Sequence, residues 1–205
     1  IPVRELRSKG WRTRPVDHAT ESMLNDATRP VDRVQHDTIN VLVGMVLAFY
    51  SAMLQCSMWK RDISKAFRRC PVRASHLEFS WIVFIAHGKR WRAQHLGMPF
   101  GATSSVYAWH RVGNLLAWLV MTQAKSPLGR YVDDFFGAAR TDIRWTGGYL
   151  LDILCSCLGF LADPSKANDF RWVMDVLGVE AKLVWADKLI RLRVSTVVIR
   201  KWLEV

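Results

Sequence analysis

Acidic residues are scarce in this sequence of 205 residues, because 18 Asp and Glu stand against 29 Lys and Arg and leave a formal net charge of +11. Residues 1–100 hold 16 of the basic and 8 of the acidic side chains, so most of the excess lies in the first half. A positive field attracts polyanions, which makes nucleic acid the first partner to expect and an anionic membrane surface the second. Charge alone does not choose between them, and a merely basic soluble protein is the alternative.

Cysteine is also scarce, with only Cys56, Cys70, Cys155 and Cys157. Four irregularly spaced cysteines do not make the disulfide framework of a small secreted domain. The Cys155-Ser-Cys157 pair has no second pair and no His cluster near it, so we interpret it as packing rather than as a zinc site. A reducing, intracellular compartment fits best, without a choice between cytoplasm and nucleus.

Long apolar runs, repeats and low-complexity linkers are absent. The longest apolar stretch, Ile39 to Leu54, contains Asn40, Gly44 and Ser51 and is shorter than the ~20 residues that span a bilayer. It therefore predicts a buried helix and no membrane partner. The chain starts without Met and without a signal-peptide pattern, which is typical of a segment excised from a longer protein.

The hydrophobic patterns predict an α+β fold, because strands and helices are interspersed without a regular βαβ rhythm. We expect an antiparallel sheet with helices on one face. The apolar residues of 142–158, its expected core stripe, are Leu150, Leu151, Ile153, Leu154 and Leu158. Tryptophans within apolar runs, such as Trp81, Trp109 and Trp118, are expected in the core. The expected elements are strands and loops over 1–35, helices over 37–54, 104–123, 142–158 and 195–205, strands over 58–63, 173–179 and 189–194, and hairpins over 77–96 and 131–137.

Two adjacent acids, Asp133 and Asp134, stand between apolar and aromatic neighbours in the run from Tyr131 to Phe136. Neighbouring negative charges repel each other, and each resists desolvation, so something cationic should compensate them. The alternative is a solvated turn that happens to contain two aspartates.

A third acid, Asp62, stands among basic residues at the end of the strand expected over 58–63. Salt-bridging to these neighbours is one explanation. The other is that Asp62 joins the Asp133–Asp134 pair to bind two divalent cations about 3.5–4 Å apart, with the surrounding bases facing phosphates.

Successive blocks of the sequence resemble the palm motifs of reverse transcriptases of the retrotransposon and retroviral type, in the same order. Tyr131-Val132-Asp133-Asp134 matches the motif C box, and the likeness covers nearly the whole chain. The other blocks are Arg14 to His18 with Asn25 for the fingers, Asp62 to Phe67 for motif A, Leu96 to Ser105 for motif B, Gly159-Phe160 with Lys166 for motif D, and Val176-Leu177-Gly178 for motif E.

This resemblance implies a right-hand polymerase palm with a partial fingers subdomain, in one domain over 1–205. The fingers part would cover about 1–56, the palm with some fingers elements about 57–185, and the palm end and start of the thumb about 186–205. The implied activity is RNA-directed DNA synthesis, in which dNTPs are added to a primer 3′-hydroxyl with two Mg²⁺ or Mn²⁺ ions. The implied partners are an RNA or DNA template with primer, dNTPs and the remainder of a retroelement polyprotein.

The family's roles pass to matching positions of this sequence. The implied catalytic residues are Asp62, Asp133, Asp134 and Lys166, the last as a general acid to pyrophosphate or only as a neutralising charge. The metal ligands would be the three aspartates and Ile63. The implied nucleotide-binding residues are Arg14, Ile63, Ser64, Lys65, Ala66, Phe67, Phe100 and Gly101. The implied primer-binding residues are Tyr131, Leu177 and Gly178.

Within this set, the backbone amides of Ile63, Ser64 and Lys65 would cradle the triphosphate, and Arg14 would grip its phosphates. Phe67 would lie beneath the incoming sugar.

The sequence departs from the family at two positions. His18 stands where the fingers usually have an acid, and Phe100 where motif B often has Gln. Two rival functions stay open: an RNA-dependent RNA polymerase, which Phe67 argues against, and a decayed element that only binds nucleic acid, which the intact set of three aspartates argues against.

Overall fold

The computed structural model describes residues 2–7, 10–15, 17, 19–31 and 33–203, and it describes side chains from residue 17 onward except at 18, 32, 201 and 203–205. The chain forms two compact units, each assembled from two separate stretches. One consists of 1–34 with 65–111 and the other of 35–64 with 112–205.

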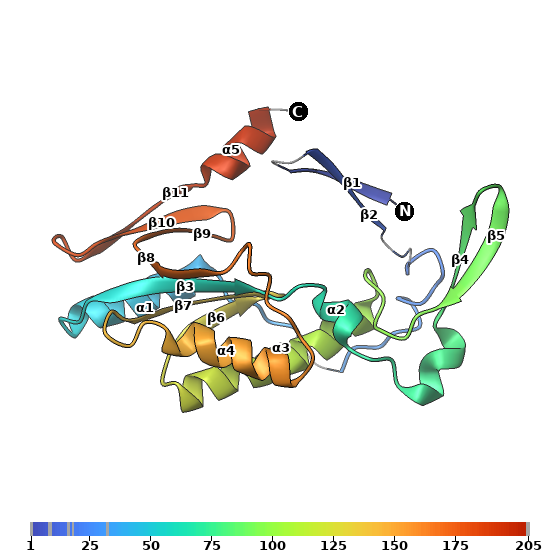
Figure 1. The fold of residues 1–205 in the computed structure, drawn as a ribbon, viewed down its shortest axis with the longest axis horizontal. Coiled ribbons are helices and arrows are strands. Elements are labelled where there is room, and N and C mark those ends of the chain that lie inside the picture. The colour runs from blue at the N-terminus through green and yellow to red at the C-terminus, as the bar shows by residue number, and fades with distance from the viewer. Residues whose placement is uncertain (1, 8–9, 16, 18, 32, 204–205) are drawn as a thin grey trace. The chain divides into compact units, whose positions relative to one another are not determined.

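The first unit is built around two antiparallel hairpins (Figure 1). In one, β1 (Pro2–Arg7) pairs with β2 (Gly10–Pro15), and in the other β4 (Trp81–Ala86) pairs with β5 (Lys89–Gln94). The β4–β5 turn, His87-Gly88, has positive φ at both residues, as a tight type I′ hairpin turn requires. A short helix, α2 (Ala66–Arg69), and a 3₁₀ helix, η1 (Ala74–Phe79), precede this hairpin. The predicted strand from Leu77 was therefore wrong over its first residues.

The second unit contains a four-stranded antiparallel sheet in the order β6-β7-β3-β8. A three-stranded antiparallel sheet in the order β11-β10-β9 accompanies it. These sheets confirm the predicted α+β class. The strands are β3 (Cys56–Asp62), β6 (Leu128–Tyr131), β7 (Asp134–Arg140), β8 (Asn168–Arg171), β9 (Val173–Val176), β10 (Val179–Val184) and β11 (Leu189–Val194). The helices are α1 (Ile39–Ser51), the second half of α3 (Thr103–Gln123), α4 (Thr146–Cys157) and α5 (Thr196–Leu203).

Successive side chains of β3 point to opposite faces of the sheet, and both faces are buried. The alternation therefore decides on which face each site residue of β3 lies. On one face, Met58 is fully buried against Leu42 and Val46 of α1 and against the β9–β10 sheet. On the other face, Trp59 packs toward α4, where a Cβ added at Gly147 would lie 3.0 Å from its ring. By the same alternation, Asp62 at the end of β3 lies on the face of Met58, which is the face that packs against α1.

Helix α4 buries a face that only partly matches the predicted stripe, because Leu151 is fully buried as expected and Leu150 and Leu154 are partly buried. Ile153 and Leu158 are 42% and 54% exposed, whereas Gly147, Gly148, Leu151 and Cys155 are buried. The strand predicted over 173–179 is likewise two strands, because a turn at Leu177-Gly178 divides β9 from β10. Strand β8 was not predicted.

Two of the three tryptophans expected in the core lie at the surface. Trp109 is 1% exposed, but Trp81 and Trp118 are 50% and 55% exposed. Across the described residues, no helix has both the length and the apolar character needed to cross a bilayer.

Candidate active site

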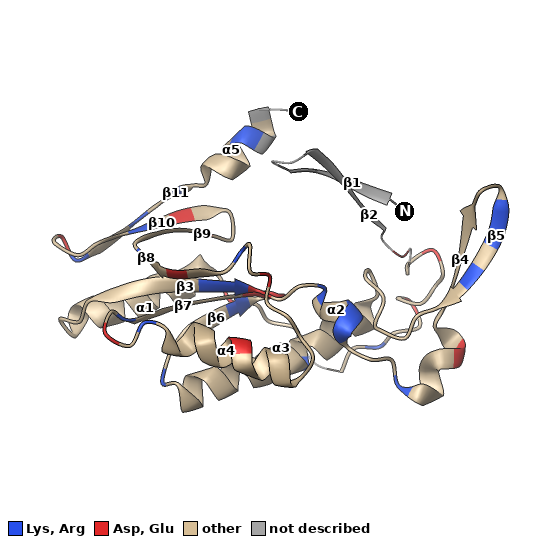
Figure 2. Ribbon diagram, in the orientation of Figure 1, with Lys and Arg blue, Asp and Glu red and all other residues tan. Residues whose placement is uncertain are grey.

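Three predicted catalytic acids lie at one end of the four-stranded sheet, where Figure 2 shows acidic residues at the tips of β3 and β7. Asp62, the last residue of β3, is directly opposite Asp134, the first residue of β7. Directly opposed residues of an antiparallel pair have Cβ atoms about 4.5–5.5 Å apart on the same face. Asp133 precedes Asp134, and its carbonyl oxygen accepts a hydrogen bond from the Ile63 N–H at 2.9 Å.

The turn that carries Asp133 is strained. Tyr131 pairs with Asp134, so only Val132 and Asp133 connect β6 to β7. Val132 has a φ of +52°, a left-handed conformation that a β-branched residue rarely adopts. Such strain persists only where surrounding contacts enforce it, and it is often found at functional sites.

Asp133 and Asp134 resist ionisation. Burial, followed by the neighbouring charge of Asp62, raises the pKa of Asp133 to about 6. Burial also raises the pKa of Asp134, although Lys60 opposes the shift. A nearby cation would relieve both effects, since it favours the charged form of a carboxylate.

Two lysines supply positive charge to this cluster. Lys166 Nζ lies 2.5 Å from Asp62 Oδ2, and Lys60 Nζ lies 3.2 Å from Asp134 Oδ1. The Lys60 contact is an ion pair without hydrogen-bond geometry, because Oδ1 of Asp134 is buried and has no hydrogen-bond partner in the described part of the chain. Among the described residues, no three His, Cys, Asp or Glu side chains are gathered into a group that could hold a metal ion. A metal at Asp62 would therefore have to replace the ammonium group of Lys166.

The donor chemistry nevertheless fits a hard divalent cation. All three side chains are carboxylates, the ligands that Mg²⁺ and Mn²⁺ prefer, and one buried carboxylate oxygen lacks a hydrogen bond. The ammonium groups of Lys60 and Lys166 supply the positive charge that a metal cation would otherwise supply to these carboxylates.

The loop after α4 is held against the end of β3 by backbone contacts. The Ser64 N–H donates to the carbonyl of Leu161 at 2.8 Å, and the Asp163 N–H donates to the carbonyl of Asp62 at 2.8 Å. This pairing brings Lys166 to Asp62. It also engages the Ser64 N–H, and the Ile63 N–H is bonded to the Asp133 carbonyl, so cradling a triphosphate with these two amides stays a prediction that requires both bonds to open.

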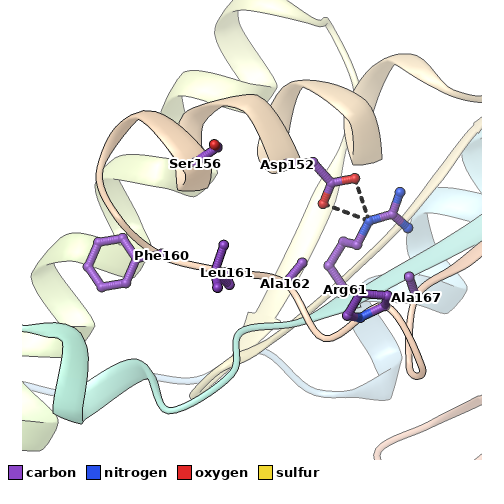
Figure 3. Close-up of a pocket in the computed structure, with 8 residues that line it drawn as sticks. Arg61, Asp152, Ser156, Phe160, Leu161, Ala162 and Ala167 are labelled. Atoms are coloured by element: carbon purple, nitrogen blue, oxygen red, sulfur yellow. Dashed lines mark hydrogen bonds and ion pairs between the residues drawn. The ribbon is translucent and has the colours of Figure 1, made fainter.

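Arg61 anchors the opposite face of the same strand and contacts carboxylates within the fold, whereas the bases around Asp62 were expected to face phosphates. Its side chain is buried and donates hydrogen bonds to Asp152 of α4 at 2.9 Å and to Asp169 of β8 at 3.0 Å. Figure 3 shows Arg61 against Asp152 at the wall of a cavity of about 270 Å³. Desolvation acts against the charge of Arg61, but its two carboxylate partners raise its pKa overall. The network ties α4 and β8 to the strand that ends in Asp62.

Several predicted nucleotide-binding residues come together within the first unit. The rings of Phe67 and Phe100 are 5.7 Å apart in an edge-to-face arrangement. Gly101 has a φ of +101°, which only glycine adopts readily. Lys65, with a φ of +55°, precedes the buried Ala66 at the start of α2. The side chain of Arg14 lies outside the described residues.

Asn25 fastens the segment around Gly101. Its Oδ1 accepts a hydrogen bond from the Thr103 N–H at 2.8 Å, and its Nδ2 donates to the Gly101 carbonyl at 3.2 Å. Nearby in the same unit, Asp17 accepts a hydrogen bond from Arg68 at 2.7 Å. One feature of the sequence indicated the contact between Asp17 and Arg68, because Asp17 is a single acid in a basic segment.

The predicted primer-binding residues lie in two turns of the second unit. Tyr131 is 46% exposed next to the Asp133 turn, with its ring 5.1 Å from that of His36. Leu177 and Gly178 both have positive φ and form the two-residue turn between β9 and β10.

Comparison of the whole fold supports the resemblance read from the motifs. No protein-family model matches the sequence, and no curated protein matches it. Solved structures do match, among them three of a foamy viral protease-reverse transcriptase. Its complex with double-stranded DNA in a form designated dRH aligns over 100% of this chain, with a TM-score of 0.68 and 15% identity. A second complex with double-stranded DNA also aligns over 100% of this chain, with a TM-score of 0.63 and 16% identity. Its complex with an RNA/DNA hybrid aligns over 97% of this chain, with a TM-score of 0.61 and 15% identity.

These alignments show that the chain has a reverse-transcriptase-like fold. The chain spans only about a third of the proteins it matches, because the three alignments cover 31%, 37% and 24% of the viral chains.

Proposed function

We propose that this chain is the core of an RNA-directed DNA polymerase whose chemistry is centred on Asp62, Asp133 and Asp134. The observation that carries the proposal is the direct pairing of Asp62 with Asp134 next to the strained turn that presents Asp133. A fold similar to that of reverse transcriptases along the full chain supports it.

Asp62, Asp133 and Asp134 would hold two Mg²⁺ or Mn²⁺ ions, with the Ile63 carbonyl as a further oxygen ligand. Bound there, the ions would activate the primer 3′-hydroxyl and stabilise the pyrophosphate leaving group. Lys166 would leave Asp62 and supply positive charge, or a proton, to the departing phosphates. Phe67 and Phe100 would contact the nucleotide, and Tyr131 with the Leu177-Gly178 turn would contact the primer.

Primer extension tests this function directly. The purified protein should extend a primer on an RNA template with dNTPs in the presence of Mg²⁺ or Mn²⁺. Extension with rNTPs alone would assign the chain to RNA-dependent RNA polymerases instead. Binding of primer-template without extension of any kind would identify a nucleic-acid-binding element that has lost its chemistry.

Divalent cations should stabilise the protein, because they relieve the repulsion among carboxylates that resist ionisation. At ten times its Kd, Mg²⁺ or Mn²⁺ is expected to add about 1.4 kcal/mol to the free energy of unfolding, a rise in Tm of about 3–6 °C. Differential scanning fluorimetry with and without the ion measures this shift. Asp142→Asn removes an exposed acid in a surface ion pair with Arg140 and should leave the shift intact. A shift that survived Asp133→Asn unchanged would place the ion elsewhere.

Nucleic-acid binding should depend on the β4–β5 hairpin. Its strand β5 carries the exposed Lys89, Arg90 and Arg92 with no acid between residues 81 and 94, and Figure 2 shows this basic stretch. Trp81 and Trp91 are half exposed beside these bases, as base-stacking side chains would be. Arg90→Glu with Arg92→Glu is expected to weaken binding of primer-template about tenfold. It should also lower the slope of log affinity against log salt by roughly 0.7–0.9 for each lost phosphate contact.

Arg191→Glu with Arg193→Glu is the matched control, because these arginines already pair with Asp187 and Glu180. Fluorescence anisotropy over a range of salt concentrations gives both slopes. Equal losses in the two double variants would mean that the hairpin binds no more specifically than the rest of the basic surface.

A further inference from the structure

A buried arginine lies directly before the strained turn of the candidate active site. Arg130, in strand β6, is only 3% exposed. One guanidinium nitrogen donates a hydrogen bond to the carbonyl of Val132 at 2.7 Å, and another donates to Asn114 Oδ1 of α3 at 2.7 Å. The guanidinium therefore links a fixed point on a long helix to the one residue of the turn that has positive φ.

Helix α3 is shaped to receive this side chain. A Cβ added at Gly113 would lie 2.9 Å from Cζ and Nε of Arg130, closer than real side chains approach. Glycine inside a helix costs about 1 kcal/mol relative to alanine, so its presence needs a compensating contact. The Arg130 guanidinium provides that contact.

The backbone of Arg130 is fixed as well. Its N–H donates to Asp37 Oδ2 at 2.8 Å, and its carbonyl accepts a hydrogen bond from the Asp37 N–H at 3.0 Å. With both its backbone and its guanidinium held, Arg130 is a rigid support for the residues that follow it.

Val132 needs such a support. A valine with a φ of +52° is strained and would otherwise relax toward an extended conformation. Relaxation would turn the next residue, Asp133, away from its place beside Asp62 and Asp134. We propose that Arg130 is a positioning residue: its guanidinium, anchored on Asn114, holds the Val132 carbonyl and so keeps Asp133 in the geometry of the active site. This inference rests on the proposed function of that site.

A double-mutant cycle tests the proposal, because glycine adopts positive φ without strain. Arg130→Gln removes the two-pronged donor, and Val132→Gly removes the need for it. Arg130→Gln is expected to lower kcat for primer extension about tenfold and to weaken Mn²⁺ binding, measured from the electron paramagnetic resonance signal of free Mn²⁺, by a similar factor. Adding Val132→Gly should restore kcat and the Mn²⁺ Kd to within about threefold of wild type.

Stability separates positioning from simple packing. Arg130→Gln should lower Tm in both backgrounds, because the hydrogen bond to Asn114 is lost in both, so kcat should recover while much of the Tm loss remains. If Arg130 only packs β6 against α3, the double variant will be no more active than Arg130→Gln, and the proposal is overturned. Arg130→Lys, which keeps the charge but not the planar fork, should fall between wild type and Arg130→Gln. Arg140→Gln, at an exposed arginine of β7, is the matched control and should change little.

The cycle also distinguishes this inference from the function on which it rests. A wild-type protein that neither extends primers nor binds Mn²⁺ would refute the proposed function. The contact between Arg130 and Val132 would still predict that Arg130→Gln lowers Tm less in the Val132→Gly background than in the wild-type background. Equal losses of Tm in the two backgrounds would overturn the positioning role, whatever the activity.

Discussion

Asp133→Asn is expected to abolish primer extension and, in the same protein, to raise stability. An amide cannot supply the negative charge that a divalent cation needs, and losing about 4 kcal/mol of transition-state stabilisation slows a reaction about a thousandfold. Primer extension on an RNA template under saturating dNTP measures the loss as kcat. Binding of primer-template should be nearly unchanged, because the acid adds no attraction for phosphate.

The stability gain follows from the raised pKa of Asp133. A carboxylate whose pKa rises from 3.8 to about 6 on folding destabilises the folded protein wherever it must ionise. The cost is absent below about pH 4, grows between about pH 4 and 6, and is constant above pH 6. Asp133→Asn removes it, so the metal-free variant should be more stable than wild type by on the order of 1–2 kcal/mol at pH 7, after allowance for partial exposure, and equally stable near pH 4.

Urea unfolding in the presence of a chelator at pH 4 and pH 7 gives both differences. Asp142→Asn, at an exposed acid, should change neither stability nor activity appreciably. An Asp133→Asn protein that still extends primers at the wild-type rate would remove Asp133 from the chemistry.

Local patterns predicted the strands and the hairpin that carry the candidate site better than the elements around them. Strand β3, the β6–β7 hairpin and helix α1 follow from local patterns: alternation, a two-residue turn and a continuous apolar run. Pairing of Asp62 with Asp134 needed only that β3 and β7 be neighbours, which the motif resemblance implied. Local patterns were therefore sufficient to predict those strands, turns and helices whose defining residues are close in sequence.

The misread face of α4 shows where local patterning fails. Glycine weakens a helix by its intrinsic propensity, but Gly147 and Gly148 form part of the buried face of α4. A Cβ at Gly148 would lie 2.9 Å from Nη2 of Arg61, so glycine there permits close approach to a buried ion pair. A pattern that counts only large apolar side chains cannot recognise a face selected for small size, and it assigned Ile153 and Leu158 to the core instead.

Side-chain partners that lie far away in sequence, outside the matched motifs, were also beyond prediction. Arg61 meets Asp152 and Asp169, which lie 91 and 108 positions away, and a basic run around a candidate catalytic acid gives no sign of which base is buried. The partner of Lys166 was equally hidden, since the resemblance placed this lysine near phosphates and the structure pairs it with Asp62. In each case the charge was visible, and its partner depended on the tertiary fold.

Phe67 lies five residues after Asp62, at the position where the family keeps an aromatic ring beneath the incoming sugar. In the structure its ring is half buried and meets Phe100 edge to face at 5.7 Å, so two predicted nucleotide-binding residues form one apolar surface within the first unit. Phe67 is not among the fully buried core residues, which weakens the alternative that it only packs the interior.

Phe67→Val should therefore raise incorporation of ribonucleotides while largely preserving the use of dNTPs. A rigid ring at this place leaves no room for a 2′-hydroxyl and offers no partner for its hydrogen bonds. Burying that hydroxyl unpaired costs on the order of 1–3 kcal/mol, to which steric overlap adds, so wild type should discriminate by at least about ten- to a hundredfold. The smaller valine removes the overlap and lets water reach the hydroxyl, so most of this discrimination should be lost.

The measurement is kcat/KM for matched dNTP and rNTP on one primer-template. Phe79→Val, at a phenylalanine of the same unit that is 74% exposed, is the matched control and should leave the ratio unchanged. Loss of dNTP and rNTP use together in Phe67→Val, with an unchanged ratio, would mean that the ring supports the fold and does not select the sugar.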